Sequence, residues 1–205
     1  KRHNWQMPKT PFPLANTLEE ELPEVEKATG IFNLFGTKIK KENTFIEEER
    51  FLCADNNLFE IFTIPVIKGR KNNLLTNPLD IVLTESAAEK YFGNNEVIGK
   101  TLEIELGGDI IALNVSGLIQ DFPSNSTFKA DIIASNELAL ENLDKIMMNT
   151  GKTKNSPDYY RNSWEMDLLV TYILTRQPVN QEEMNMKLGK IEEQHLKDPD
   201  VKDYF

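Results

Sequence analysis

Hydrophobic residues recur at every fourth position near the start of the chain, which predicts an amphipathic helix. Thr10 can cap this helix, and Pro11 suits its first helical position. Pro23 ends it, because proline removes a backbone donor and clashes with the preceding turn. The apolar face comprises Leu14, Leu18 and Leu22, and the glutamates at 19–21 face away from it.

Short runs of apolar and β-branched residues predict strands along the rest of the chain. Gly107-Gly108-Asp109 separates two alternating runs, which is the clearest hairpin pattern in the sequence. A Lys-rich turn joins two further runs nearer the start. The predicted strands cover residues 29–40, 44–55, 79–83, 101–106, 110–119 and 168–175.

Three more helices are predicted between and after these strands. Thr84 can cap a helix that runs to Phe92, with Gly93 as its left-handed terminator. Residues 137–148 predict a short Leu-rich helix, and residues 152–157 a mobile loop. The last helix covers 182–196 and has Met184, Leu188, Ile191 and His195 on one side.

The order of these elements predicts an α+β fold with two lobes. The final strand and helix have no partner nearby in the sequence, so we expect them to pack against the first helix and strands. Residues 1–50 with 164–205 would then form a βαβ-type lobe built from both chain ends. Residues 51–135 would form an inserted mixed α/β lobe, and residues 136–163 a variable helix and loop.

Composition is that of an ordinary soluble protein, with 205 residues, 40% hydrophobic and 27% charged. The net charge of −10 argues against general nucleic-acid binding. The run from Lys38 to Lys41 is followed by glutamates at 42 and 47–49, so we interpret it as a solvated hairpin or loop surface. No apolar stretch of about 18 residues is present, and we expect the chain to be a piece of a longer polypeptide.

The sequence offers little for catalysis. Of two histidines, His3 and His195, neither sits in a motif with Ser or with the lone Cys53, which we expect to be a small buried hydrophobe. Ser86 and Lys90 share a helix face, a spacing that recurs by chance. Gly107-Gly108 lacks the pattern of a phosphate loop. We therefore predict no enzyme activity and assign no catalytic, cofactor-binding or metal-binding residue.

An aromatic cluster precedes the last strand and allows two interpretations. Tyr159, Tyr160 and Trp164 could present a platform for a partner or ligand, since aromatic residues anchor interfaces. They could instead fold over the core at the strand entrance, which burial tendencies favour.

The block from Phe51 to Ser126 carries an ordered series of short segments, which are Ala54–Phe62, Ile67-Lys68-Gly69, Ile81–Gly93, Ile98–Leu102, Val115–Leu118 and Asp121–Ser126. Together these segments resemble the periplasmic core domain of MacB-like, FtsX-type ABC transporter permeases. The entry helix of that domain is similar to residues 11–29, and its closing strand is similar to Trp164 and residues 171–174. The least recognisable part is 136–163.

The resemblance implies a domain between the first two membrane helices of a permease, facing the periplasm of a bacterial inner membrane. It implies a cytoplasmic ABC ATPase, fused or separate, that moves the domain, a permease dimer, and a periplasmic partner protein or substrate. It assigns no site residue and no particular substrate.

Two other function classes remain open at this point. A ligand-sensing extracytoplasmic domain of a membrane receptor would also be acidic and bounded by membrane helices. An extracellular acidic hydrolase would need a pocket that holds carboxylates with raised pKa.

Overall fold

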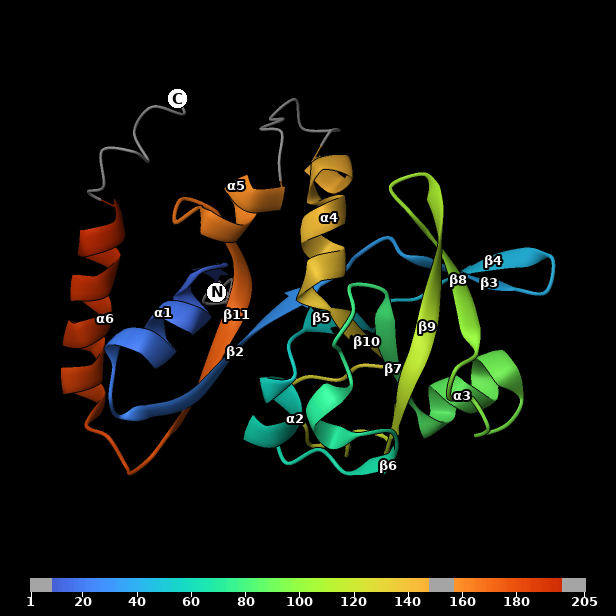
Figure 1. The fold of residues 1–205 in the computed structure, drawn as a ribbon, viewed down its shortest axis with the longest axis horizontal. Coiled ribbons are helices and arrows are strands. Elements are labelled where there is room, and N and C mark those ends of the chain that lie inside the picture. The colour runs from blue at the N-terminus through green and yellow to red at the C-terminus, as the bar shows by residue number, and fades with distance from the viewer. Residues whose placement is uncertain (1–8, 148–156, 197–205) are drawn as a thin grey trace, which may run out of the picture.

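One mixed sheet runs through the residues that the computed structural model describes, which are 9–147 and 157–196 (Figure 1). Its strands are β1 (Thr10–Pro11), β2 (Val25–Asn33), β3 (Lys38–Lys41), β4 (Thr44–Glu47), β5 (Phe51–Ala54), β6 (Val66–Lys68), β7 (Asp80–Thr84), β8 (Thr101–Leu106), β9 (Asp109–Ile119), β10 (Ile132–Ser135) and β11 (Asp167–Thr175). The helices are α1 (Leu14–Glu21), α2 (Asn57–Ile61), the 3-10 turn η1 (Lys71–Asn73), α3 (Glu85–Phe92), α4 (Asn136–Met147), α5 (Pro157–Asn162) and α6 (Gln181–Leu196).

The strands follow the order β1-β11-β2-β5-β10-β7-β9-β8-β3-β4, and β6 pairs with β9 beside this path. The pairs β5/β10 and β7/β9 are parallel, and the other pairs are antiparallel. The mixed α+β class is therefore confirmed. None of the described helices is long and apolar enough to cross a membrane.

Buried side chains on the middle strands alternate between two hydrophobic clusters, as the pleat of a strand requires. Phe51 and Cys53 of β5 enter one cluster together with residues of α3, α4 and α5. Leu52 and Ala54 enter the other, with residues of α2. The sheet is thus covered on both faces in its central part.

A third cluster joins the two ends of the described chain. Helices α1 and α6 lie on the same side of β2 and β11 in Figure 1. Ala15 and Leu18 of α1 share this cluster with Met184 and Ile191 of α6. The predicted packing of the last helix with the first is therefore confirmed.

Strand β2 connects the strands near the chain ends, β1 and β11, to the rest of the sheet, which begins with β5. Its residues from Val25 to Ile31 pair with β11, and its last two residues, Phe32 and Asn33, pair with β5. In the hairpin formed by β3 and β4, strand β3 pairs with β8. Because one sheet runs without a break through all of these strands, the division into two lobes with the stated boundaries stays a prediction.

Local signals predicted several elements correctly. The Thr84 hydroxyl accepts a hydrogen bond from the Ala87 amide at 3.2 Å, and Gly93 ends α3 at φ +70°. The β8–β9 hairpin turns at Gly107 and Gly108, both at positive φ. These signals succeed because each depends on neighbours within a few residues.

Other predictions were wrong. Thr10 and Pro11 form a short strand against β11, and the helix begins at Leu14. The predicted strand 29–40 is two strands, β2 and β3, because Gly36 turns the chain at φ +73°. The predicted strand 44–55 is likewise divided into β4 and β5. Central strand β10 was not predicted.

Candidate functional site

The residues considered for catalysis do not meet. The Ser86 hydroxyl donates to Asp121 at 2.5 Å, whereas the Lys90 ammonium donates to Glu48 at 2.8 Å. Cys53 is fully buried, and burial raises the pKa of its thiol. His195 stacks on Trp164 at the end of α6. These side chains have separate structural roles.

The aromatic cluster folds over the core, as burial tendencies predicted. Tyr160 of α5 is buried in the cluster that also holds residues of α3 and α4, and Trp164 is buried in the cluster that joins α1 and α6. Tyr159 packs edge-on against Tyr160. His3 and the predicted loop at 152–157 lie outside the described residues.

Glu48 is the centre of a buried polar cluster at the base of the β3–β4 hairpin. Its side chain is 3% exposed and accepts hydrogen bonds from Lys90 at 2.8 Å, the Tyr91 hydroxyl at 2.5 Å and the Arg50 amide at 3.1 Å. Its own amide donates to the carbonyl of Thr37 at 2.9 Å. Glu48 therefore fastens the hairpin to α3, and the interpretation of residues 47–49 as solvated is wrong at this position.

Electrostatics favour the ionised form of Glu48. Burial raises its pKa, but the hydrogen bonds from Lys90, Tyr91 and the Arg50 amide outweigh burial, so the pKa lies below the usual glutamate value. Burial and the nearby Glu48 charge raise the pKa of Asp131, although Arg50 lies 2.6 Å from its carboxylate. The cluster holds opposite charges in pairs, which is typical of a structural network.

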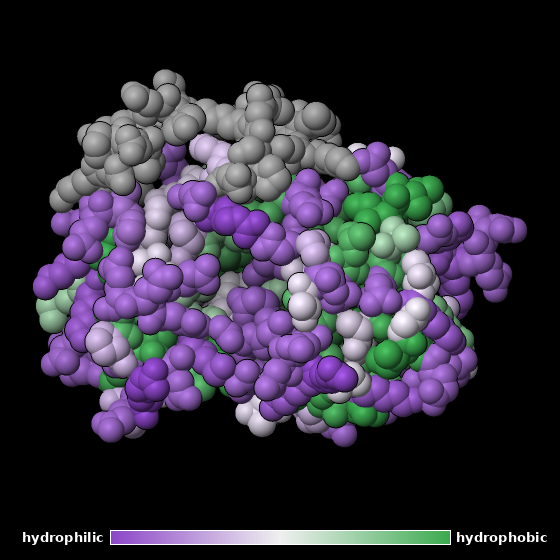
Figure 2. Space-filling view, in the orientation of Figure 1, coloured by the Kyte–Doolittle hydropathy of each residue, from purple (hydrophilic) through white to green (hydrophobic). Residues whose placement is uncertain are grey.

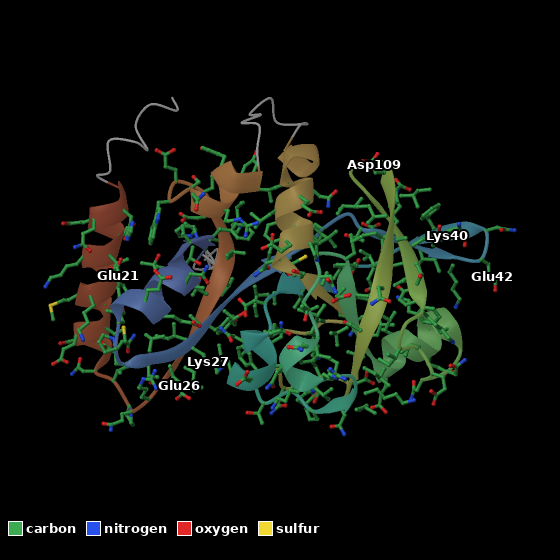
Figure 3. All side chains as sticks on the ribbon, viewed as in Figure 1. Glu21, Glu26, Lys27, Lys40, Glu42 and Asp109 are labelled. Atoms are coloured by element: carbon green, nitrogen blue, oxygen red, sulfur yellow. The ribbon has the colours of Figure 1, made fainter. Side chains whose placement is uncertain are left out.

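A cleft of about 670 Å³ separates the turn of the β3–β4 hairpin from α3 and the start of β8. Its lining has acidic, basic and aromatic side chains. Lys40 of β3 forms an ion pair with Glu103 of β8. Figure 3 shows Lys40 and Glu42 on the hairpin, at the side of the molecule away from α6. The lining residues are Lys40, Lys41, Glu42, Glu89, Lys90, Tyr91, Phe92, Gly93, Thr101, Leu102 and Glu103.

This arrangement favours binding over chemistry. Lys90 at the cleft is neutralised by buried Glu48 and lies over the Tyr91 ring at 4.9 Å. Lys100 lies over the Phe92 ring at 5.3 Å. Among the residues that the structure describes, no three histidine, cysteine or acidic side chains come close enough to hold a metal ion. The hairpin, the cleft and α3 form the candidate interaction site.

Residues 2–191 match the family model of the MacB-like periplasmic core domain. The chain belongs to this family. The resemblance inferred from the segments between Phe51 and Ser126 is therefore confirmed. The MacB-like domain is a periplasmic or extracellular, non-catalytic domain of an ABC transporter permease.

Solved structures share the fold of this MacB-like domain. A domain of a protein assigned as a permease, from Porphyromonas gingivalis, is 21% identical with a TM-score of 0.70, over 92% of this chain and 72% of that one. The periplasmic region of MacB from Actinobacillus actinomycetemcomitans is 16% identical with a TM-score of 0.60, over 93% and 76%. The extracellular domain of the noncanonic ABC-type transporter YknZ from Gram-positive bacteria is 13% identical with a TM-score of 0.50, over 84% and 74%.

No curated protein matches the chain. The receptor and hydrolase alternatives lose their support, because the family is one of transporter permease domains. The Glu48 cluster and the cleft were missed by sequence reasoning, because their members come from residues 40–48, 89–93 and 101–103.

Proposed function

We propose that this domain transmits ATP-driven motion of its permease to the outside of the membrane and binds a partner protein or substrate there. The permease would act as a dimer with a cytoplasmic ABC ATPase, fused or separate. One observation carries the proposal: β2 pairs with β11 along most of its length and with β5 at its end. Motion that enters through the elements at the two chain ends would therefore reach β5 and the strands beyond it through the shared strand β2.

Side chains from three helices reinforce this strand. The Glu19 carboxylate of α1 accepts hydrogen bonds from the Ala28 amide at 2.5 Å and from the Asn57 amide group of α2 at 2.8 Å. Asn57 also donates to the Ala28 carbonyl at 2.9 Å. Two residues further along β2, Asn136 of α4 donates to the Gly30 carbonyl at 3.0 Å. These bonds stiffen β2 just before its pairing partner changes after Ile31, which supports transmission as a rigid body.

Distance measurements between spin labels in the full-length permease with its ATPase test the proposal. Asn43→Cys lies in the exposed hairpin turn, and Met186→Cys replaces a side chain on α6 that is 62% exposed. We expect the distance between both labels within one domain to stay constant. The distance between equivalent labels of two permease copies should change when ATP is bound and trapped.

An ATPase that cannot bind ATP is the matched control, and it should abolish the change. Equal distances between copies with and without trapped ATP would contradict transmission. A change within one domain would contradict rigid-body transmission through β2.

A further inference from the structure

The two ends of the sheet are protected very differently. At one end, β1 has only two residues, one of them Pro11, and pairs with β11 in a shifted register. Short length, proline and irregular pairing all discourage further strand addition. At the other end, β4 has four exposed residues, no proline and a regular register with β3. Within the described ranges no strand pairs with its outer side, so β4 is an open edge.

The hydrogen-bond ladder identifies which backbone groups of β4 point outward. The Glu48 amide donates to the Thr37 carbonyl, so residues 37 and 48 form a hydrogen-bonded pair. Bonded and non-bonded pairs alternate in an antiparallel ladder. In the register of the hairpin, Ile46 of β4 and Ile39 of β3 therefore form the next hydrogen-bonded pair. The N–H and C=O groups of Phe45 and Glu47 face away from β3. These two residues can accept an additional strand.

The side chains of β4 give such a strand apolar contacts on both faces of the sheet. Phe45 and Ile46 are 38% and 37% exposed, and successive residues of a strand point to opposite faces. Cross-strand pairs of aromatic and β-branched residues stabilise sheets. An added strand with an apolar residue opposite Ile46 would bury part of this surface.

The charged residues around β4 indicate which kind of segment would bind to its open edge. Lys38 is paired with Glu105 at 3.0 Å, and Lys40 is paired with Glu103, so the basic residues of β3 are already neutralised by β8. Three exposed carboxylates, those of Glu42, Glu47 and Glu49, have no ion pair within the part of the chain that the structure describes. Figure 2 shows the hairpin as a hydrophilic projection from the molecule.

We propose that β4 binds an extended segment of a partner protein that adds as a further strand and carries Lys or Arg at alternating positions. A basic residue opposite Glu47 meets an unpaired carboxylate. The next basic residue then lies opposite Phe45 on the same face, where its aliphatic stem packs on the ring, and the apolar residue between them lies opposite Ile46. A second copy of this chain fits less well, because two-fold pairing of β4 would join acidic edges of a chain with net charge −10. This inference rests on the proposed function, since it names the chemistry of the partner.

A seven-residue peptide of alternating Lys and Val is the probe, added to the 205-residue chain without ATP. We expect saturable binding that slows hydrogen exchange at the Phe45 and Glu47 amides. The same peptide methylated at every backbone nitrogen cannot donate to the edge, and we expect its affinity to fall by about ten-fold or more. A peptide with Glu in place of Lys should also bind more weakly.

Two matched pairs of variants separate backbone pairing from side-chain contacts. Phe45→Pro removes an outward donor that β3 does not use, and Phe45→Ala keeps that donor but removes the ring. Phe45→Pro should abolish binding, whereas Phe45→Ala should weaken it by a smaller factor. Glu47→Lys should reverse the preference between the Lys and Glu peptides, and Glu20→Lys on α1 should not.

Several results would overturn the inference: full affinity of the methylated peptide, protection at amides other than those of the hairpin, or equal affinity for both charges. Dimerisation of the chain that Phe45→Pro abolishes would assign the edge to a second copy and would also overturn it. The peptide experiment uses no ATPase, so its failure leaves the transmission experiment unaffected. Conversely, unchanged spin-label distances in the permease would contradict transmission but would leave the peptide-binding result as it stands.

Discussion

The indole ring of Trp164 stacks on the imidazole ring of His195, with centroids 4.2 Å apart and planes 4° from parallel. This contact joins the segment before β11 to the last turn of α6. His195 also lies 3.2 Å from the carboxylate of Glu21 at the end of α1. One buried indole therefore holds together three segments from both halves of the sequence.

Trp164→Ala should destabilise the domain by about 3–5 kcal/mol, because it leaves a large cavity among the chain ends. Chemical denaturation measures the loss, and hydrogen exchange should accelerate most in α6. His195→Ala is the control that keeps the indole, and we expect a cost near 1 kcal/mol. Uniform acceleration across β7 and α6 at low denaturant would contradict a local role for this contact.

Glu48→Gln should destabilise the domain by about 1–3 kcal/mol, because Lys90 loses its ionic partner while part of the hydrogen bonding persists. The pKa of Glu48 is lowered in the folded state. Its contribution is therefore present above the ordinary glutamate pKa of about 4.3 and is lost as the pH falls through the folded value.

The pH dependence of unfolding checks this assignment of Glu48. The free energy of unfolding of the Glu48→Gln variant should fall less steeply below about pH 4.3 than that of the unaltered chain. Glu49→Gln is the matched control at an exposed neighbour and should leave both stability and pH dependence nearly unchanged. Identical profiles for Glu48→Gln and the unaltered chain would show that the buried charge contributes nothing.

Asp55→Asn should stabilise the domain at neutral pH. Burial raises the pKa of Asp55, although the hydrogen bond from the Asn57 amide opposes the shift. The folded state then binds a proton more tightly than the unfolded state, so stability falls as the pH rises from about 3.9 through the folded pKa. Thermal unfolding at several pH values measures the gain, which should shrink below about pH 4. Glu26→Gln, at an exposed position on β2, should show no such trend.

Gly69→Ala should cost more than Gly99→Ala, although both glycines have positive φ, +105° and +76°. A Cβ at Gly69 would lie 2.7 Å from the Ser116 carbonyl oxygen, whereas nothing lies within 4 Å of a Cβ at Gly99. Backbone conformation alone costs about 1–2 kcal/mol, and the clash adds about 1–3 kcal/mol at Gly69. Denaturation midpoints compare the two variants, and equal losses would show that the backbone around Ser116 yields freely.

The sequence predicts the parts of this fold that depend on near neighbours. Thr84 and Gly93 delimit α3 as expected, because a cap and a left-handed terminator act within one helical turn. Strand β10 escaped prediction, since its four residues are specified by β5 and β7 on either side. The burial of Glu48 was also not predicted, because its partner Lys90 lies 42 residues away in the chain.

The candidate site shows the same limit. The Lys-rich turn was predicted, but not that the basic residues of β3 would be neutralised by glutamates of β8. Only the sheet order reveals that β4 has no neighbour on its outer side in the described chain. The fold family, in contrast, could be inferred from sequence, because a series of turns and caps in fixed order is itself specific.

The sheet order also governs when this domain can fold. Strand β5 requires β10, which is made some 80 residues later, and β2 requires β11, with Ile31 opposite Val170. Contacts between such distant segments slow folding, because the loops between them must close first. During synthesis, β5 therefore lacks β10 until residue 135 has been made, and β2 lacks β11 until residue 175 has been made. We expect these two strands to depend on chaperones in those intervals.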